Sequence, residues 1–178
     1  MKYEMIFSGF GGQGALAIGK FIAQSAMTEG KNVSWLPSYG PEMRGGTANV
    51  SVVVSDTEIA SPVVSTPTVM VALNQPSLDK FGPDVKPQGL IIVNEDLCPK
   101  VVKRSNIDYV VVPFNTLAKE IGSDKVLNMI AIGIIIEKTN IIKYDTLADE
   151  LTAFLKDRNP ELLKLNLEAI QKGMELAK

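Results

Sequence analysis

A glycine-rich segment near the start of the chain constrains the fold more than any other feature. The apolar run Tyr3–Ser8 is typical of a buried strand, and Gly9–Gly14 follows it directly. Residues Ala15–Glu29 then carry apolar side chains at helical spacing, and Gly30 is placed to end that helix. With a second strand expected at Val33–Leu36, the order of strand, glycine loop, helix and strand predicts the βαβ opening of an α/β fold.

The glycine loop contains the pattern Gly-x-Gly-x-x-Gly, formed by Gly9, Gly11 and Gly14. Glycines at this spacing let the backbone approach a pyrophosphate at the positive end of a helix, as in dinucleotide-binding folds. Such folds also carry an acidic residue about 20 residues further on, at the end of the second strand, to bind the ribose. Here that strand ends at Leu36 before a proline, and Glu29 lies at the end of the helix instead.

Three interpretations of this loop remain open. It is a tight turn that lets the helix pack closely on the sheet, a site for a phosphate or another anion, or an NAD(P) site that lacks the usual acid. A Walker-type phosphate site is excluded, because no Gly-Lys-Ser/Thr sequence ends the loop. The candidate residues in this loop are Gly9, Gly11, Gly12, Gln13 and Gly14.

The rest of the chain continues as short apolar strands and amphipathic or apolar helices. Strands are expected at 48–54, 68–73, 90–93 and 109–112, and helices at 75–81, 126–137, 145–156 and 160–177. Asn159 followed by Pro160 is a clear helix start, because the asparagine side chain accepts from backbone amides and proline has none to satisfy. The pattern predicts a single three-layer α/β/α domain over residues 1–178, with a mostly parallel sheet.

Composition excludes several classes of chemistry. The chain has no histidine and a single cysteine, Cys98, so it cannot build a His-dependent catalytic triad, a zinc site or a four-thiolate cluster by itself. Cys98 is expected to be a small buried hydrophobe. The net charge of −2 gives no sign of nucleic-acid binding or of a membrane surface. The longest apolar run, Met129–Ile136, is far shorter than the ~20 residues that span a bilayer, and no signal peptide is visible, so a cytoplasmic protein is expected.

A second loop after the second expected strand is dense in groups that can bind. It combines the opposite charges of Glu42 and Arg44 with Tyr39 and the backbone-shaping pair Gly45 and Gly46. Rigid polar loops beside a strand end are where binding sites and interfaces are found. A solvated ion pair within an ordinary connecting loop is the alternative.

These motifs, taken in order along the chain, closely resemble the gamma subunits of 2-oxoacid:ferredoxin oxidoreductases. The resemblance rests on Gly9–Gly14, Ser38–Gly46 and Ala72–Gln75, with Ser61-Pro62 and Asn128 as further family positions. It implies a subunit of an enzyme that decarboxylates a 2-oxoacid, forms an acyl-CoA and passes electrons to ferredoxin. The second loop looks more like those of the 2-oxoglutarate and branched-chain (2-oxoisovalerate) types than those of the pyruvate type.

The resemblance also implies where the cofactors lie. In that family thiamine diphosphate and magnesium are held by the alpha and beta chains, and iron–sulfur clusters by the beta chain or by a ferredoxin-like delta chain. This sequence has neither a Cys-x-x-Cys pair nor a Gly-Asp-Gly segment, so no cofactor and no catalytic residue are expected in it. The expected partners are the alpha, beta and delta subunits, with ferredoxin reached through the complex. A free-standing NAD(P)-dependent oxidoreductase and a purely structural partner protein are the alternatives.

Both loops are expected at one edge of the sheet. Because they follow the first two strands, we expect them at the carboxyl ends of adjacent parallel strands, where α/β sheets bind ligands. Free amides at the start of the first helix and the charge of Arg44 would suit an anion, such as a coenzyme A phosphate or a partner's carboxylate. The alternative is that Arg44 pairs only with Glu42.

Overall fold

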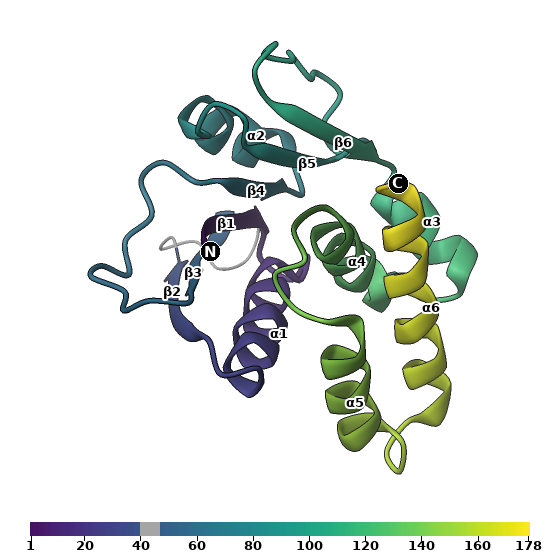
Figure 1. Ribbon diagram of the computed structural model, residues 1–178. Coiled ribbons are helices and arrows are strands. Elements are labelled where there is room, and N and C mark those ends of the chain that lie inside the picture. The colour runs from purple at the N-terminus through teal and green to yellow at the C-terminus, as the bar shows by residue number, and fades with distance from the viewer. Residues whose placement is uncertain (40–46) are drawn as a thin grey trace.

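A single sheet runs through the protein, shown in Figure 1. The computed structural model describes residues 1–39 and 47–178. Within those residues the sheet has six strands in the order β2-β3-β1-β4-β5-β6. The strands are β1 (Lys2–Phe10), β2 (Asn32–Tyr39), β3 (Thr47–Ser55), β4 (Val69–Ala72), β5 (Leu90–Asn94) and β6 (Asp108–Val112).

The sheet is mostly parallel, as predicted, but one end of it is not. β1, β4, β5 and β6 pair in parallel, whereas β3 is antiparallel to both β1 and β2. The expectation that the first two strands are adjacent is therefore wrong. β2 and β3 form an antiparallel pair, and β3 takes the place beside β1, so β2 lies at the edge. An edge position also explains why β2 continues through Pro37, which cannot donate a ladder hydrogen bond.

The helices cover the two faces of the sheet unequally (Figure 1). The sheet face that includes Met5 and Phe7 packs against most of the helices. Among the described residues, the opposite face is covered by α2, by η1 and by two loops beside them. The helices are α1 (Ala15–Thr28), α2 (Gln75–Phe81), η1 (Gly82–Asp84), α3 (Phe114–Ile121), η2 (Asp124–Val126), α4 (Leu127–Thr139), α5 (Tyr144–Leu155) and α6 (Pro160–Leu176). The three-layer α/β/α prediction is confirmed, with one thin outer layer.

The main core lies between the sheet and α1 and α4. Met5 and Phe7 alternate with Ile6, which points to the other face, as the two-residue period of a strand requires. Phe7, Ile18 and Ile130 are fully buried there. Each such side chain contributes about 1.5–3 kcal/mol by leaving water, which makes this the main stabilising layer.

α4 is an apolar helix buried between the sheet and α6, as its sequence predicts. Gly133 of α4 and Gly173 of α6 lie where the two helices cross. A Cβ on Gly133 would lie 2.1 Å from the Ile170 oxygen, so the backbones are in direct contact at this crossing. None of the helices in residues 1–39 and 47–178 is both long and apolar enough to cross a bilayer.

Two predicted helix ends are confirmed, and one helix is new. Gly30 adopts a positive φ of 79° and ends α1, while the Asn159 side chain accepts from the Leu162 amide, 3.0 Å away, to start α6. α3 is not apparent in the sequence pattern, because Pro113 marks only the end of the preceding strand. Its first amides are capped from another loop, since both the Thr116 amide and hydroxyl donate to Asp96 at 2.8 and 2.9 Å.

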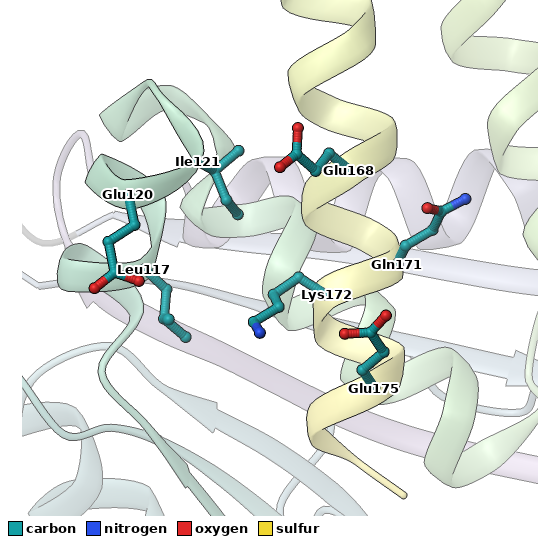
Figure 2. Close-up of a pocket in the computed structure, with 7 residues that line it drawn as sticks. All are labelled: Leu117, Glu120, Ile121, Glu168, Gln171, Lys172 and Glu175. Carbon is teal, nitrogen blue, oxygen red and sulfur yellow. The ribbon is translucent and has the colours of Figure 1, made fainter.

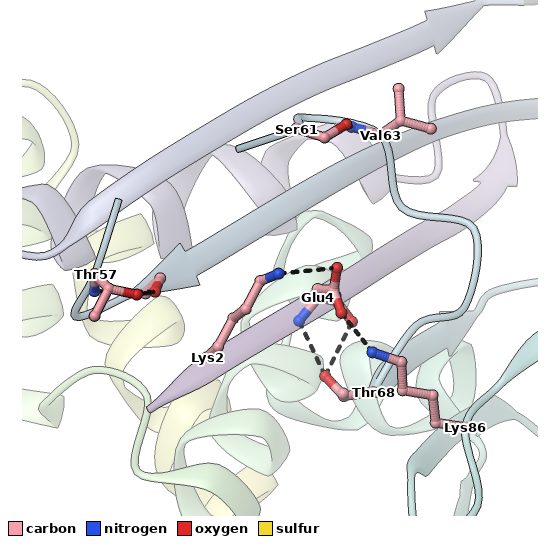
Figure 3. A network of polar contacts seen from close by, with 8 residues as sticks. Lys2, Glu4, Thr57, Ser61, Val63, Thr68 and Lys86 are labelled. Atoms are coloured by element: carbon pink, nitrogen blue, oxygen red, sulfur yellow. Dashed lines mark hydrogen bonds and ion pairs between the residues drawn. The ribbon is translucent and has the colours of Figure 1, made fainter. Parts of the chain in front are cut away.

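A polar network ties the amino end of β1 to the loop that precedes β5, as Figure 3 shows. Glu4 pairs with Lys86 at 2.5 Å and with Lys2 at 3.4 Å. The Thr68 hydroxyl accepts from the Glu4 amide and donates to the Glu4 carbonyl, both at 3.0 Å. Hydrogen bonding to Lys86 lowers the pKa of the Glu4 carboxyl from 4.5, against the opposing effect of its partial burial.

Candidate functional site

The carboxyl ends of the parallel strands bring several polar residues to one edge of the sheet. The glycine loop follows β1, Asn74 follows β4, Asn94 ends β5, and α3 begins just after β6. This is the edge at which open α/β sheets bind ligands. Ser8, Asn74 and Asn94 lie at or next to these strand ends, and the side chains of all three are buried.

The glycine loop forms a tight turn between β1 and α1. The Gln13 amide donates to the Phe10 carbonyl at 3.1 Å, which closes the turn. Gly12, inside it, has a φ of 88°, a conformation that side-chain-bearing residues rarely adopt. Gly9, the second-to-last residue of β1, lies where the side chains of Gln13 and of Leu73, which follows β4, both approach closely. The sequence interpretation of the loop as a close-packed turn therefore agrees with this geometry.

Gln13 joins the ends of two strands. Its Oε1 accepts from the Phe10 amide and, at 3.4 Å, from Nδ2 of Asn74, while its Nε2 lies 3.4 Å from the Leu73 carbonyl. The side chain thus lies back over the sheet edge and holds the loop against β4. Gln13 is a scaffold residue of the site in this structure, since its carboxamide is occupied by internal contacts.

Asn94 is a buried residue of this edge that sequence reasoning did not single out. Its Nδ2 donates to the Leu73 carbonyl at 3.1 Å and to Oδ1 of Asn115 at 2.8 Å, and its Oδ1 accepts from the Phe114 amide at 3.2 Å. One carboxamide therefore links β4, β5 and the start of α3. A single asparagine at the end of the apolar run 90–93 was the only signal for it.

The start of α1 presents backbone donors at the same edge. Gly14 is its N-cap residue, with a φ of 92° and no capping side chain, and no acidic residue lies in the first turn. First-turn amides have no partner inside a helix, and the helix dipole makes this end positive. Asn128 of α4 lies beside Gly14, since a Cβ there would be 3.4 Å from the Asn128 Cβ. This geometry suits an anion.

The second loop begins at the same edge as the first. Tyr39, the last residue of β2, pairs with Ala48 of β3, and Ala48 pairs with Gly9 of β1. The two loops are therefore separated by one intervening strand, and they share an edge because β2 runs in the same direction as β1. The predicted site residues Glu42, Arg44, Gly45 and Gly46 lie outside the described residues, as does the side chain of Tyr39.

The strand arrangement weakens the NAD(P) interpretation. The position beside β1 that would hold the ribose-binding acid belongs to β3, whose Thr47 lies opposite Phe10. Glu29, the acid at roughly the right spacing, lies at the far end of α1. There it pairs with Lys31 at 2.8 Å and accepts from the Lys143 amide at 2.6 Å. The acid is thus committed to a structural contact away from the loop.

Neither Cys98 nor the acidic side chains form a metal site in the described part of the chain. Cys98 is 2% exposed, and burial, with a smaller effect from Asp79, raises the pKa of its thiol to about 11. The prediction that Cys98 is buried is confirmed. Within residues 1–39 and 47–178, no group of three or more His, Cys, Asp or Glu side chains converges as metal ligands would.

A separate hollow of ≈ 320 Å³ lies between α3 and α6, shown in Figure 2. Glu120 comes from α3, whereas Glu168 and Glu175 come from α6, with Lys172 between them. The residues predicted as a site do not line it. This hollow is therefore not part of the candidate site at the carboxyl edge of the sheet.

Comparison with known proteins shows the family. Residues 4–176 match the family "Pyruvate ferredoxin/flavodoxin oxidoreductase". The 2-oxoglutarate synthase subunit KorC of Methanocaldococcus jannaschii is 34% identical over 182 residues, which cover 100% of this chain and 95% of that protein. The ketoisovalerate oxidoreductase subunit VorA of Methanothermobacter marburgensis is 36% identical over 171 residues, 96% of this chain. This chain spans about a third of VorA, 36% of its length.

Solved structures agree with the sequence comparison. The gamma subunit of a keto/oxoacid ferredoxin oxidoreductase from Geobacter sulfurreducens superposes with a TM-score of 0.82 at 30% identity, covering 98% of each chain. A 2-oxoglutarate:ferredoxin oxidoreductase from Magnetococcus marinus, solved with 2-oxoglutarate, coenzyme A and succinyl-CoA, gives a TM-score of 0.89 at 26% identity; the match covers 99% of this chain and 31% of that one. The chain therefore belongs to the pyruvate ferredoxin/flavodoxin oxidoreductase family and has the fold of its gamma subunits.

Proposed function

We propose that this chain is the gamma subunit of a 2-oxoglutarate:ferredoxin oxidoreductase. The observation that carries the proposal is the match to KorC of Methanocaldococcus jannaschii, which extends over 95% of that subunit. The complex would cleave carbon dioxide from 2-oxoglutarate, join the remaining acyl group to coenzyme A, and pass the two electrons released to ferredoxin. The solved relative from Magnetococcus marinus contains substrate, coenzyme A and succinyl-CoA, which fits this reaction.

Within that complex we assign this chain a non-catalytic but required role. With no histidine and one cysteine, it lacks the ligands that an iron–sulfur cluster needs. The thiol of Cys98 is buried and its pKa is raised to about 11, so it is a poor thiolate ligand. Thiamine diphosphate, magnesium and the clusters would belong to alpha, beta and ferredoxin-like delta subunits.

The carboxyl edge of the sheet is the surface that we propose for contact with coenzyme A or with a partner subunit. The uncapped start of α1 offers backbone donors, and Gly12 and Gln13 hold that loop in a fixed shape. Arg44 belongs to the loop that leaves β2 at the same edge, and a guanidinium binds phosphate or carboxylate in a bidentate way. Together these groups favour an anionic group, such as a coenzyme A phosphate or a partner's carboxylate.

Arg44→Ala tests this assignment in the reconstituted complex. If Arg44 meets a ligand or partner in a desolvated site, its loss costs about 2–5 kcal/mol of assembly or of coenzyme A affinity. An exposed pair with Glu42 alone would cost under about 1 kcal/mol. Glu42→Gln is the matched control, because it breaks that pair and keeps the cation. Unchanged assembly together with unchanged coenzyme A dependence in Arg44→Ala would leave the loop as scaffold.

A branched-chain 2-oxoacid enzyme is the second candidate, since VorA of Methanothermobacter marburgensis is 36% identical over 171 residues. Purified complex, assayed with 2-oxoglutarate, 2-oxoisovalerate and pyruvate under the same coenzyme A and ferredoxin concentrations, separates the two. We expect the highest kcat/KM with 2-oxoglutarate. A clear preference for 2-oxoisovalerate would move the assignment to the branched-chain type.

A nicotinamide-dependent enzyme remains as the alternative from another class. Because β3 occupies the place beside β1, and the described residues of β2 include no acid to bind a ribose, we expect NAD(P) to bind no more tightly than about −5 kcal/mol. Calorimetry on the isolated chain measures this directly. Low-micromolar NAD(P) affinity would favour the dehydrogenase and contradict the proposed role.

A further inference from the structure

β2 is an edge strand of the sheet, and within residues 1–39 and 47–178 it pairs with β3 alone (Figure 1). An edge strand exposes a row of backbone donors and acceptors, which proteins protect by charged side chains, by proline or by short length. At the other edge, β6 has five residues, and its Asp108 pairs with Lys138 at 3.3 Å. β2 has eight residues and none of them is charged, so of these protections it has only Pro37.

The hydrogen bonds of the sheet show which residues of β2 face outward. The Ser8 carbonyl accepts from the Leu73 amide at 2.9 Å, so Ser8 faces β4 and its neighbour Phe7 faces β3. Phe7 pairs with Val50, which therefore faces β1 and not β2. Pro37 pairs with Val50 and so faces away from β3, where its missing N–H leaves no gap in the ladder.

The same alternation turns Val33 and Trp35 outward, because they lie four and two residues before Pro37. The outer side of β2 thus offers the amides of Val33 and Trp35 and the carbonyls of all three residues. Trp35 is 40% exposed and Leu36 is 41% exposed, and they point to opposite faces of the strand. A second strand beside β2 would satisfy these backbone groups and cover part of both side chains.

β2 is complementary to itself when two copies lie antiparallel with Trp35 opposite Trp35. The two Trp35 residues then exchange both of their backbone hydrogen bonds, and the Val33 amide of each copy donates to the Pro37 carbonyl of the other. Two indole rings lie side by side on one face of the sheet, and aromatic pairs across strands are stabilising. No like charges meet, because β2 carries none. A two-fold contact needs a segment that complements itself in this way.

We propose that β2 pairs with β2 of a second copy of this chain, antiparallel and centred on Trp35. The sheet of one copy then continues into the sheet of the other across a two-fold axis. Because the pair is antiparallel, the carboxyl edges of the two sheets face opposite directions, and the two candidate sites lie on opposite sides of the joined sheet. The pairing does not depend on the proposed reaction.

The oligomeric state of the purified chain tests the contact. Trp35 is the one tryptophan of the chain, so its emission reports on this surface. We expect sedimentation equilibrium to show a monomer–dimer equilibrium, and Trp35 emission to move to shorter wavelength as dimers form. A chain that stays monomeric at every concentration would overturn the proposal.

A charge on the two-fold axis tests the place of the contact. Trp35→Glu sets two carboxylates opposite each other, so it should weaken the dimer by about ten-fold or more in sedimentation. Val102→Glu is the matched control, because Val102 is 75% exposed on the loop before β6, at the other end of the sheet. It should leave the dimer unchanged. Equal effects of the two variants would overturn the proposal.

Crosslinking tests the register and keeps Trp35 in place. In the proposed pairing Ser34 lies opposite Leu36 of the second copy, with Cα atoms about 4.5 Å apart, a spacing that suits a disulfide. A mixture of Ser34→Cys and Leu36→Cys chains should therefore crosslink on mild oxidation, whereas either variant alone should not. The native Cys98 is buried, with a pKa raised to about 11, and does not compete. Crosslinking absent from the mixture, or equal in each variant alone, would overturn the register.

The assembled complex separates a second copy from another subunit as the occupant of this edge. We expect complex reconstituted from the same mixture of variants to form the crosslink as well. If another subunit supplies the strand, the complex does not form the crosslink, and Trp35 emission shifts only when the other subunits are added to a monomeric chain. That result would overturn the pairing with a second copy.

Discussion

Gly9→Ala is the most informative single change at the glycine loop. A Cβ at this position would lie 2.6 Å from Oε1 of Gln13 and 2.9 Å from the Leu73 Cβ. Both contacts are shorter than side chains tolerate, so one of the partners has to move. The Gln13 carboxamide is the more movable of the two, and its displacement breaks its contacts with the Phe10 amide, the Leu73 carbonyl and Asn74.

The size of the effect follows from those contacts. Each net hydrogen bond is worth about 0.5–1.5 kcal/mol, and the two at 3.4 Å belong at the low end of that range. Overpacking against Leu73 adds about 1 kcal/mol or more. We therefore expect Gly9→Ala to lower the free energy of unfolding by about 3 kcal/mol, which corresponds to a fall of about 6–12 °C in Tm for a chain of this size.

A double-mutant cycle with Gln13→Ala, followed by urea unfolding, tests the reasoning. Gln13→Ala removes the oxygen that the new Cβ would meet, so the double variant should cost about 1–2 kcal/mol less than the sum of the single variants. Gly82→Ala is the control, because its Cβ would lie an ordinary 3.4 Å from Leu78. Additive costs, or a Gly9→Ala cost no larger than that of the control, would refute the explanation from the contact with Gln13.

Three further outcomes are expected. Glu4→Gln should destabilise the folded protein at pH 7, because hydrogen bonding to Lys86 lowers the pKa of the Glu4 carboxyl in the folded state below 4.5. In urea titrations, the stability difference between wild type and variant should disappear as the pH falls through that lowered pKa, and a pH-independent difference would contradict this reasoning. Cys98, with a pKa of about 11, should resist iodoacetamide at pH 8 until urea is added; rapid native labelling would contradict its burial. Gly133→Ala should lower Tm despite better helix propensity, because its Cβ would meet the Ile170 oxygen at 2.1 Å; an unchanged or raised Tm would contradict the close crossing.

Elements with strong local signals could be predicted from the sequence, and those held by distant groups could not. The helix at Gln75–Phe81 has the predicted bounds, because Asn74 and an early proline mark its start. α3 was missed because its first amides are satisfied by Asn94 and Asp96, about 20 residues earlier. The place of β2 was also missed, since no local pattern shows that β3 returns to pair with β1.

The candidate site shows the same division. A tight turn before a helix was one of the three interpretations of the glycine loop, and the positive φ at Gly12, a conformation that favours glycine, agrees with it. The contacts of Gln13 with Leu73 and Asn74 join segments about 60 residues apart and have no periodic signature. Asn128 was noted only as a family position, and its place beside Gly14 depends on how α4 packs on α1.

The central claim is that this chain is a required, non-catalytic gamma subunit, and subunit omission tests it most directly. Ferredoxin reduction by 2-oxoglutarate and coenzyme A would be followed for the alpha, beta and delta subunits alone, for those subunits with this chain added, and for this chain alone. We expect turnover only when this chain completes the set, and none from it alone. Full activity in its absence, or turnover by the lone chain, would contradict the claim.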